Sequence, residues 1–248
     1  MIPALIIGRK GSTGFPNKNV YKVLGRPLMS YPILAVKNSK YVDKNSIYIS
    51  TDSKAIENVG VKYGCRPIKR PQYLATNEAL AEDAFIHGYK SIIVQLSKDV
   101  EFIVLLFCNG ATITPGIIDK GIKKLRENPS FDSACTVSLY NMWSPLRAKK
   151  IDNGVLKPFG RISDFSDPTC DRDSQGDTYF ADCSAFICRP ICLKKHYGDL
   201  PFRWIGRKVL PLKQWGGLDL DYKWQLGQLR FWLQAHGFSL KKTPYDKR

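Results

Sequence analysis

Short apolar runs alternate with helix-length segments along this chain, and no other feature limits the possible folds as strongly. Strand-sized runs are expected at residues 2–8, 46–50 and 101–107, the last reading EFIVLLF. Helices are expected between and after them, at residues 27–38, 53–64, about 79–97 and 114–127. Thr114 and Pro115 suit the N-cap and first position of the last of these helices. The order predicts an α/β fold with a mostly parallel sheet flanked by helices.

The rhythm changes after residue 140, where prolines and an Asp/Ser/Gly-rich stretch replace the alternation. We interpret residues 141–177 as an excursion from the sheet rather than a second domain. Later strands are expected at 178–188 and 205–212, and a terminal helix at 221–236. Residues 1–238 are therefore predicted to form one domain, and residues 239–248 a frayed basic tail.

The charge balance favours acidic partners, because 38 basic and 22 acidic residues give a net charge of +16. Nucleic acid, acidic lipids and small anionic substrates all fit that sign, and composition does not choose among them. No apolar stretch approaches the ~20 residues of a spanning helix, and no secretory signal is evident, so a cytoplasmic protein is expected. Seven cysteines without a CxxC pair, and only three histidines, favour buried free thiols over a zinc site or disulfides.

A glycine-rich loop follows the first apolar run, in the sequence IIGRKGSTGFPNKN at residues 6–19. Such a turn presents backbone N–H groups to phosphate oxygens, and its cations add to the attraction. The P-loop and dinucleotide patterns do not match, since the glycines fall at positions 8, 11 and 14. Taken alone, the loop also fits a plain turn with solvated cations.

Further segments join this loop in a recognisable set. The residues Arg9, Gly11, Ser12, Gly14, Pro16, Lys18 and Asn19 resemble the signature of the cytidylyltransferases that activate acidic nine-carbon sugars, the CMP-sialic acid synthetase family. Similar elements occur at 25–28 (GRPL), 50–53 (STDS), 70–76 (RPQYLAT) and 219–221 (DLD). The resemblance covers roughly residues 3–235. It implies a Rossmann-like nucleotidyltransferase sheet, transfer of CMP from CTP to an acidic 2-keto sugar with release of pyrophosphate, and a homodimer with its contact near residues 141–177.

The resemblance also implies roles for individual residues. The nucleotide would be bound by Arg9, Gly11, Ser12, Lys18, Asn19 and Arg70, and the sugar by Phe107, Asn109 and Tyr179. Asp219 and Asp221 project to one side of an extended segment, so both carboxylates can meet one Mg²⁺. Arg9, Lys18 and Asp219 would act in catalysis. The alternatives are that Asp221 caps the last helix, that Asp219 is a solvated turn residue, and that Arg70 is a surface cation; Asp52 is expected to be an N-cap.

The sequence departs from the family mainly where the acceptor sugar would bind. Thr13 stands where the family usually has lysine, and Phe107 stands where a glutamine normally contacts the acyl sugar. A phenylalanine supplies no amide hydrogen bonds, so the acceptor differs or binds through Asn109. The alternatives are a nucleotidyltransferase with another sugar or base, a non-catalytic nucleotide-binding relative, and a basic nucleic-acid-binding protein, although no nucleic-acid motif is recognisable. We expect neither nucleic acid nor a membrane as a partner.

Overall fold

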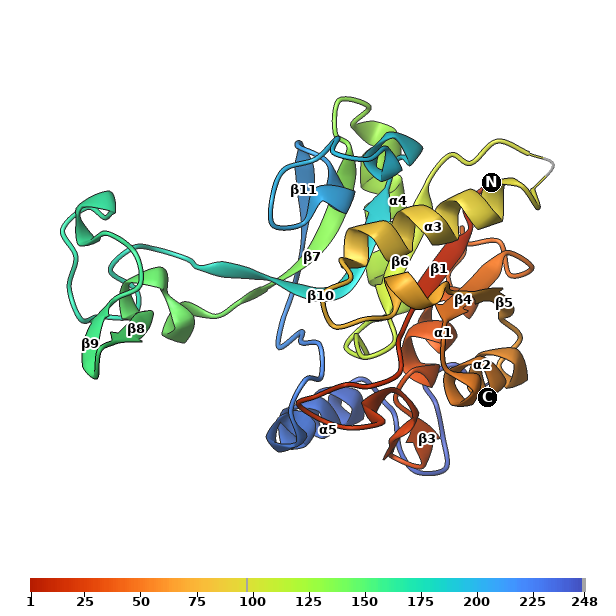
Figure 1. The fold of residues 1–248 in the computed structure, drawn as a ribbon, viewed down its shortest axis with the longest axis horizontal. Coiled ribbons are helices and arrows are strands. Elements are labelled where there is room, and N and C mark those ends of the chain that lie inside the picture. The colour runs from red at the N-terminus through yellow and green to blue at the C-terminus, as the bar shows by residue number, and fades with distance from the viewer. Residues whose placement is uncertain (97, 247–248) are drawn as a thin grey trace.

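A seven-stranded mixed sheet forms the centre of the computed structural model, which describes residues 1–96 and 98–246 (Figure 1). Its strand order is β11-β7-β10-β6-β1-β4-β5, and every pairing is parallel except the two made by β10. The strands are β1 (Ala4–Ile7), β4 (Ile47–Thr51), β5 (Arg66–Lys69), β6 (Ile103–Phe107), β7 (Ser133–Leu139), β10 (Tyr179–Cys188) and β11 (Val209–Gln214). The prediction of a mostly parallel α/β sheet is confirmed.

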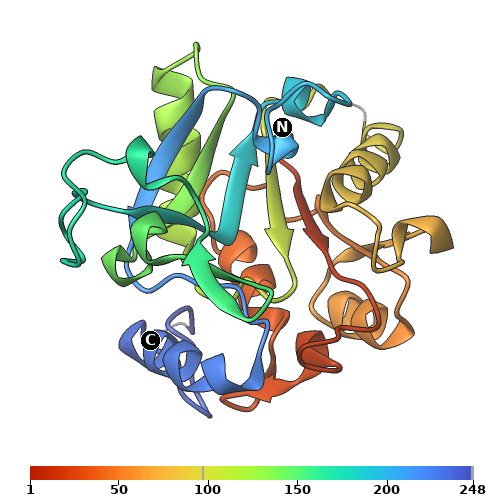
Figure 2. The ribbon, with the colours of Figure 1, turned by 60° about the vertical axis from the view of Figure 1, so that its left-hand side comes forward.

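Helices cover both faces of this sheet (Figure 2). One face carries α1 (Ser30–Lys37), α2 (Lys54–Lys62) and α4 (Pro115–Glu127), whose apolar residues form a continuous core with β1, β4 and β6. The opposite face carries α3 (Ala81–Ile93), which packs with the alternate residues of the same strands. Because a central parallel strand is buried on both faces, β1 reads as an uninterrupted apolar run.

The N-cap residues of α4 and α2 test the two predicted helix caps. The Thr114 side chain accepts a hydrogen bond from the Ile117 N–H and Pro115 occupies the first turn, as expected for α4. The expectation that Asp52 caps α2 is wrong, because Ser53 occupies the cap position and accepts from the Ile56 N–H. Asp52 lies one residue too early to reach the first turn, and its carboxylate binds another segment.

Several element boundaries differ from the sequence prediction. The helix expected over 79–97 covers only Ala81–Ile93, and residue 97 lies outside the described part of the chain. The strand expected over 205–212 is shifted to Val209–Gln214, after a 3₁₀ turn at Arg203–Ile205. The helix expected over 221–236 is a 3₁₀ turn at Lys223–Gln225 followed by α5 (Leu226–Ala235). In each case a short turn replaces regular structure at the predicted end.

The sequence pattern did not predict two strands of the main sheet, β5 and β7. β5 is an edge strand whose sequence RPIK buries only Ile68, so it lacks an apolar run. β7 is buried but contains Ser133, Thr136 and Ser138 at positions of zero exposure, so its composition hides its burial. Both strands take their conformation from their neighbours in the sheet, an influence that a single-sequence pattern does not contain.

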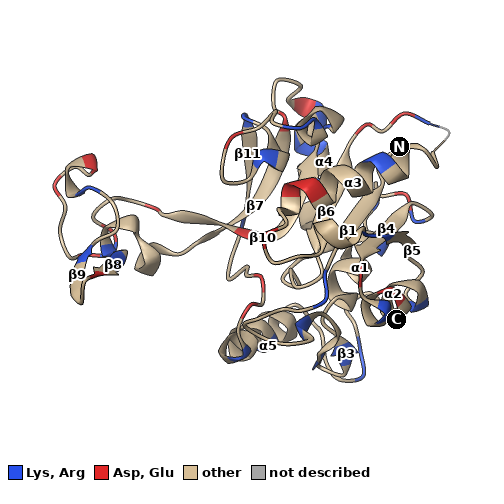
Figure 3. Ribbon diagram, viewed as in Figure 1, with Lys and Arg blue, Asp and Glu red and all other residues tan. Residues whose placement is uncertain are grey.

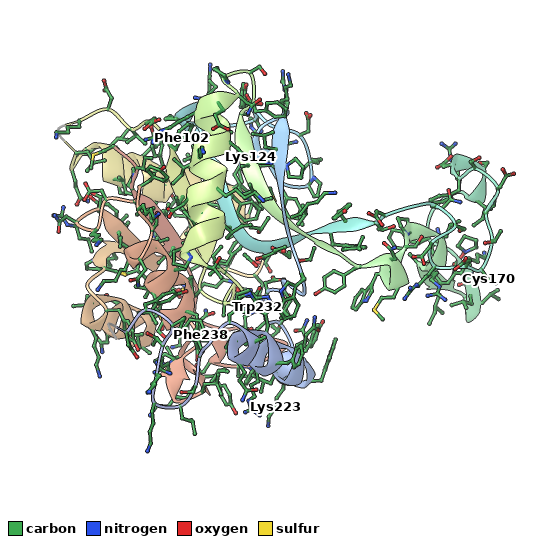
Figure 4. The ribbon with its side chains drawn as sticks, turned by 180° about the vertical axis from the view of Figure 1, so that it is seen from behind. Phe102, Lys124, Cys170, Lys223, Trp232 and Phe238 are labelled. Carbon is green, nitrogen blue, oxygen red and sulfur yellow. The ribbon has the colours of Figure 1, made fainter. Side chains whose placement is uncertain are left out.

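Residues 141–177 form an arm that extends well beyond the sheet, at the left of Figure 1. Paired ends of β7 and β10 lead into it, with Tyr179 opposite Leu139, and it ends in a hairpin of β8 (Lys149–Asp152) and β9 (Val155–Pro158). Cys170 lies on this arm, away from the body (Figure 4), and it is exposed, contrary to the expected burial of the thiols. Five other cysteines are buried and Cys183 is half-buried.

The chain after α5 packs against the body instead of fraying. Figure 4 labels Trp232 on α5 and Phe238 just after it, and both belong to a third apolar cluster beneath the hairpin of β2 (Lys22–Val23) and β3 (Arg26–Pro27). The Tyr245 and Phe238 ring centroids are 5.6 Å apart, and Arg26 donates a 2.6 Å hydrogen bond to the Ser239 carbonyl. The expected frayed tail is therefore wrong for residues 239–246, because Tyr245 supplies an apolar anchor.

Basic and acidic residues are interspersed over both the body and the arm (Figure 3). Across residues 1–96 and 98–246, no helix has the length and apolar character needed to cross a membrane.

Candidate active site

A cavity of about 370 Å³ opens at the carboxyl ends of the central strands. The register aligns Ile7 at the end of β1 with Ser50 of β4 and with Phe107 of β6. The segments that leave these strands therefore meet at one rim, the place where open α/β sheets usually bind ligands. The cavity is lined by Ile7, Gly8, Arg9, Ser12, Thr13, Gly14, Lys18, Asn19, Arg70, Leu74, Ala79, Leu80, Ala81, Ala84, Phe107, Asn109, Asp221 and Tyr222.

The residues that line this cavity fall into two groups of different chemistry, which we call walls. We call the polar one the loop wall, formed by residues 8–19 with Arg70 and Asp221. The other is the apolar wall, formed by Leu74, Ala79, Leu80, Ala81, Ala84 and Phe107. The loop wall carries the charged side chains of the cavity, and the apolar wall contributes only hydrocarbon side chains.

Glycines allow the loop wall to approach its neighbours closely. A Cβ on Gly8 would lie 2.5 Å from the Cys108 Sγ, and one on Gly14 would lie 2.8 Å from the Asp221 carbonyl oxygen. Gly11 has a φ of +80°, a conformation that side chains with a Cβ rarely adopt. The Asp52 carboxylate accepts a 2.9 Å hydrogen bond from the Lys10 N–H and thereby helps to fix the loop. Asp52 is therefore a loop-positioning residue, which the sequence prediction missed.

Lys18 and Asp221 form an ion pair across the cavity floor. The Lys18 side chain is only 12% exposed and that of Asp221 is 52% exposed. The Asn109 Nδ2 also faces this carboxylate at 3.4 Å, and it donates to the Leu220 carbonyl at 3.2 Å. The loop after β1 is thus tied to the segment at residues 219–221, more than 200 positions later in the chain.

Asp219 lies two residues before Asp221 and is half-buried. Burial, followed by the negative charge of Asp221, raises the pKa of Asp219 to about 6. Two carboxylates that oppose each other's ionisation fit a divalent cation, because the cation would neutralise both. The chain supplies two hard oxygen donors here, and no group of three or more His, Cys, Asp or Glu side chains gathers anywhere in the described residues. This donor set fits Mg²⁺, which usually takes one or two carboxylates together with phosphate oxygens and water.

Arg70 is not the surface cation that one interpretation of its sequence context suggested. It is only 5% exposed, and its Nη2 donates a 2.8 Å hydrogen bond to the Ser50 carbonyl. Desolvation lowers the pKa of Arg70 from its usual value. Its Nε has no protein partner, and neither does the Oδ1 of Asn19, which is 8% exposed. A buried donor and a buried acceptor thus line the cavity with unused hydrogen-bonding capacity.

The proposed site residues fall into two groups. The cavity brings together Arg9, Ser12, Lys18, Asn19, Arg70, Phe107, Asn109 and Asp221. Gly11 lines a smaller recess beside the loop, and Asp219 lines neither space but is near enough to Asp221 to interact with its charge. Tyr179 is outside the lining, at the root of the arm, where its hydroxyl accepts a 2.7 Å hydrogen bond from the Lys213 Nζ. A sugar-binding role for Tyr179 therefore remains a prediction.

Sequence reasoning missed most of the apolar wall. Leu74 was recognised as part of the RPQYLAT element at residues 70–76, but Ala79, Leu80 and Ala81, which begin three residues after its end, were assigned only to a helix. Tyr222 was also missed, although it follows Asp221 and its ring lies 3.2 Å from where a Gly14 Cβ would be. Both groups lie just after a recognised element, at residues 70–76 and 219–221. Extending each element by a few residues would have included them.

The mostly parallel sheet thus carries a cationic, glycine-rich cavity at the carboxyl ends of its central strands. Residues 3–151 match the model of the family described as Cytidylyltransferase, and the chain belongs to that family.

The curated relatives act on acidic sugars according to their names. The Helicobacter pylori pseudaminic acid cytidylyltransferase and UDP-2,4-diacetamido-2,4,6-trideoxy-beta-L-altropyranose hydrolase is 27% identical over 157 residues, which is 63% of this chain and 29% of that protein. The N-acylneuraminate cytidylyltransferase of Escherichia coli is 34% identical over 87 residues, 35% of this chain and 20% of that protein. The matches thus span less than a third of these two relatives.

Solved structures extend the similarity to the whole chain. A CMP-2-keto-3-deoxy-manno-octonic acid synthetase complexed with CTP has a TM-score of 0.66 at 14% identity, covering 96% of this chain and 99% of that one. The 4-diphosphocytidyl-2C-methyl-D-erythritol synthase of Anaerococcus prevotii has a TM-score of 0.60 at 16% identity, covering 94% and 96%. At such identities these likenesses establish the fold alone.

Proposed function

We propose that this protein transfers CMP from CTP to an acidic 2-keto sugar and releases pyrophosphate. The observation that carries the proposal is the loop wall, where glycines, Lys18 and Arg70 surround one cavity beside Asp221. Membership of the cytidylyltransferase family supports the transfer chemistry, and the names of the relatives support the acceptor class. The sialic, legionaminic and pseudaminic acids belong to this class.

The loop wall would bind the nucleotide. Lys18 and Arg9 supply positive charge for the triphosphate, and Ser12 and the loop N–H groups supply hydrogen bonds. The unused Arg70 Nε is a donor for a carbonyl or ribose oxygen, and the unused Asn19 Oδ1 is an acceptor for an amine or hydroxyl. Satisfying these two buried atoms makes nucleotide binding favourable, because each is costly when it has no partner.

Asp219 and Asp221 would hold Mg²⁺, which when bound polarises the α-phosphate and neutralises the departing pyrophosphate. Lys18 leaves Asp221 and turns to the triphosphate in this arrangement. Because the pKa of Asp219 is raised to about 6, a proton would compete with the cation for this carboxylate at and below that pH.

The acceptor would bind between the apolar wall and the segment at Asn109, with Tyr179 as a more distant candidate contact. Its hydroxyl oxygen forms a bond to the α-phosphorus while the bond to pyrophosphate breaks, and the hydroxyl proton is released. Arg9 and Lys18, which line the cavity, would stabilise the charge that develops on the phosphate oxygens.

We further propose a homodimer formed through the arm. The arm carries exposed large apolar side chains, including Met142, Trp143, Ile151 and Phe159, which are 56–78% exposed. Apolar groups exposed to this extent on a narrow extension are typical of a surface that another chain covers. The arm is part of the proposed domain of residues 1–238, against which residues 239–246 pack. We also propose that the protein is cytoplasmic.

Pyrophosphate release tests the proposed function. The protein is incubated with Mg²⁺, each of the four nucleoside triphosphates, and a panel of N-acetylneuraminate, pseudaminic acid and 2-keto-3-deoxy-manno-octonic acid. Release only with CTP and one acid supports the proposal, and release with another triphosphate identifies a different base. A folded protein that binds CTP but releases no pyrophosphate would indicate the non-catalytic alternative, which Thr13 at the cavity favours because it removes a family cation.

A further inference from the structure

Asp182 on β10 is a buried carboxylate that the proposed reaction does not use. It is 4% exposed, and it accepts hydrogen bonds from the Ser138 Oγ at 2.7 Å, the Gln214 Nε2 at 2.9 Å and the Ser184 N–H at 3.1 Å. None of the ion pairs within residues 1–96 and 98–246 includes it. Burying a carboxylate without an ion-pair partner is costly, which favours a role for Asp182 beyond packing.

The strand is irregular at this residue. Its register with β7 shifts between Ala181 and Phe186, and Cys183 has a φ of +56°, which residues other than glycine seldom adopt. The irregularity lies against the loop after β6, since a Cβ on Gly110 would lie 2.7 Å from the Cys183 carbonyl oxygen. Bulges of this kind re-aim side chains and are common beside active sites. The strained backbone therefore favours a functional role for its neighbour Asp182.

A first hydrogen-bond chain leads from Asp182 to Gly217. The Ser138 hydroxyl, which donates to the Asp182 carboxylate, accepts a 2.9 Å hydrogen bond from the Gly217 N–H. The approach is close, because a Cβ on Gly217 would lie 2.2 Å from the Asp182 Oδ2. Tyr140, at the root of the arm, donates a 3.0 Å hydrogen bond to the Gly217 carbonyl. Side chains from β7 and from the residue after it thus hold both polar groups of the Gly217 backbone.

A second chain leads from Asp182 to Leu218. Asp182 accepts from the Ser184 N–H, and the Ser184 Oγ lies 2.9 Å from the Thr112 Oγ1. The Leu218 N–H donates a 2.8 Å hydrogen bond to the same Thr112 oxygen. The two chains therefore end on the two residues that precede Asp219.

Residues 217–221 lie between β11 and the 3₁₀ turn before α5, outside any strand or helix. Contacts with neighbouring loops and side chains therefore decide where this segment runs. Further along it, Asn109 holds Leu220 through both the N–H and the carbonyl group of that residue. Asp219 and Asp221 are next to these fixed points, so a displacement of residues 217 and 218 would move the carboxylates.

We propose that Asp182 is a positioning residue for the metal, which fixes residues 217 and 218 through both chains and thereby places the Asp219 and Asp221 carboxylates for one Mg²⁺. The inference rests on the proposed function, because it concerns the metal of that reaction. Placement matters for this ion, since Mg²⁺ requires near-ideal octahedral geometry. Asp182 does not line the cavity, so it acts through the segment and not on a ligand.

Calorimetry of CTP binding without an acceptor tests the inference. The Kd for CTP is measured once with EDTA and once with saturating Mg²⁺, and the ratio of the first to the second reports what the metal contributes. Asp182→Asn should lower this ratio by about tenfold, since hydrogen bonds to a charged group contribute on this order. Either orientation of the new amide sets its NH₂ group against a donor, the Gln214 Nε2 or the Ser184 N–H. The Kd in EDTA should stay within about twofold of the wild-type value.

Two further variants separate positioning from charge and from stability. Ser138→Ala keeps the Asp182 charge and breaks the first chain, so the ratio should fall by about threefold. Combining it with Asp182→Asn should add little, because both changes break the same chain. Asp132→Asn is the matched control, because the Asp132 carboxylate also accepts from three donors and does not line the cavity. This control should lower Tm without changing the ratio.

Ratios within twofold of wild type in folded Asp182→Asn and Ser138→Ala would overturn the inference while leaving the proposed function intact. If Asp182→Asn does not fold, Ser138→Ala alone decides. An equal fall in Asp132→Asn would also overturn it, because the effect would then follow stability. A wild-type ratio near one would do the same, since the carboxylates would hold no metal.

Pyrophosphate release is measured separately on the wild-type protein. Metal-dependent CTP binding without release on any acid would overturn the proposed function, and the ratios of the variants would still decide the role of Asp182.

Discussion

The two walls of the cavity are held in place by different physical means. The loop wall consists of backbone and charged side chains fixed by discrete polar contacts, such as the Asp52 carboxylate beneath Lys10 and the ion pair of Lys18 with Asp221. The apolar wall joins the hydrophobic core through Ala81, Ala84 and Phe107, and the Phe107 ring packs against that of Phe85. Substitutions in the loop wall are therefore expected to leave the fold intact, whereas substitutions at Phe107 are expected to lower stability.

The largest effect is expected at the two carboxylates beside the loop wall. Replacing Asp219 and Asp221 together with asparagine should lower Mg²⁺-dependent turnover by about a thousandfold or more, because no cation would then be held at the phosphates. Circular dichroism should show an unchanged fold. Glu127→Gln, at the exposed end of α4, is the control. Turnover that stays within a few-fold of wild type would remove the metal role of this pair.

The next effect concerns the cation of the loop wall. Lys18→Ala should raise the KM for CTP by about ten- to a hundredfold, since a charge-assisted hydrogen bond to phosphate is lost. Thermal stability should change little, because the lost ion pair includes a carboxylate that is half exposed.

Lys22→Ala, on the surface in β2, provides the comparison. If Lys18→Ala and Lys22→Ala show the same CTP dependence, Lys18 does not contact the triphosphate.

The apolar wall should respond in the opposite way. Phe107→Ala should destabilise the protein by about 2 kcal/mol, roughly half of the loss for a fully buried ring, which lowers Tm by about 4–8 °C. The Kd for CTP, measured by calorimetry without acceptor, should remain within about twofold. A large loss of CTP affinity in Phe107→Ala would show that the apolar wall also contributes to nucleotide binding, contrary to the proposed separation of roles.

The smallest expected effect is a pH dependence from Asp219. Its pKa in the folded protein is about 6, above its ordinary value of 3.8. The folded state therefore binds the Asp219 proton more tightly than the unfolded state does, so protonation of Asp219 stabilises the fold. This stabilisation is complete below about pH 4 and is lost as the pH rises through 6. Without divalent cations, the free energy of unfolding should fall by about 1 kcal/mol over this range, with allowance for partial exposure.

Asp219→Asn removes the titrating group and should flatten that part of the profile, which urea unfolding at several pH values can measure. A profile with the same slope in the variant would assign the pH dependence to other groups.

Sequence patterns predicted the fold and the loop wall because both depend on local signals. The apolar runs of β1, β4 and β6 mark buried strands, and the glycines and cations of residues 8–19 predict a functional turn, which the structure places at the cavity. Arg70 was recognised only through its resemblance to a family element. Its burial depends on the pairing of β4 with β5, which no local pattern contains.

The apolar wall was less accessible to sequence reasoning for a related physical reason. Ala81 and Ala84 read as ordinary helix residues, and only the packing of α3 on the sheet makes them part of a cavity, whereas Ala79 and the exposed Leu80 precede the helix. The same limit applies to the tail, where Tyr245 is one aromatic residue among charged ones until it meets Phe238.

Under the proposed function, the ion pair of Lys18 with Asp221 would compete with the ligands of the cavity. A triphosphate without a divalent cation would draw Lys18 away and leave the Asp221 carboxylate unpaired, and a cation alone would draw Asp221 away and leave the Lys18 ammonium group unpaired. Binding of the two as one complex would exchange one internal pair for two new ones, so the affinities for metal and nucleotide would be thermodynamically linked. Free cation and free nucleotide should therefore each bind more weakly than their complex.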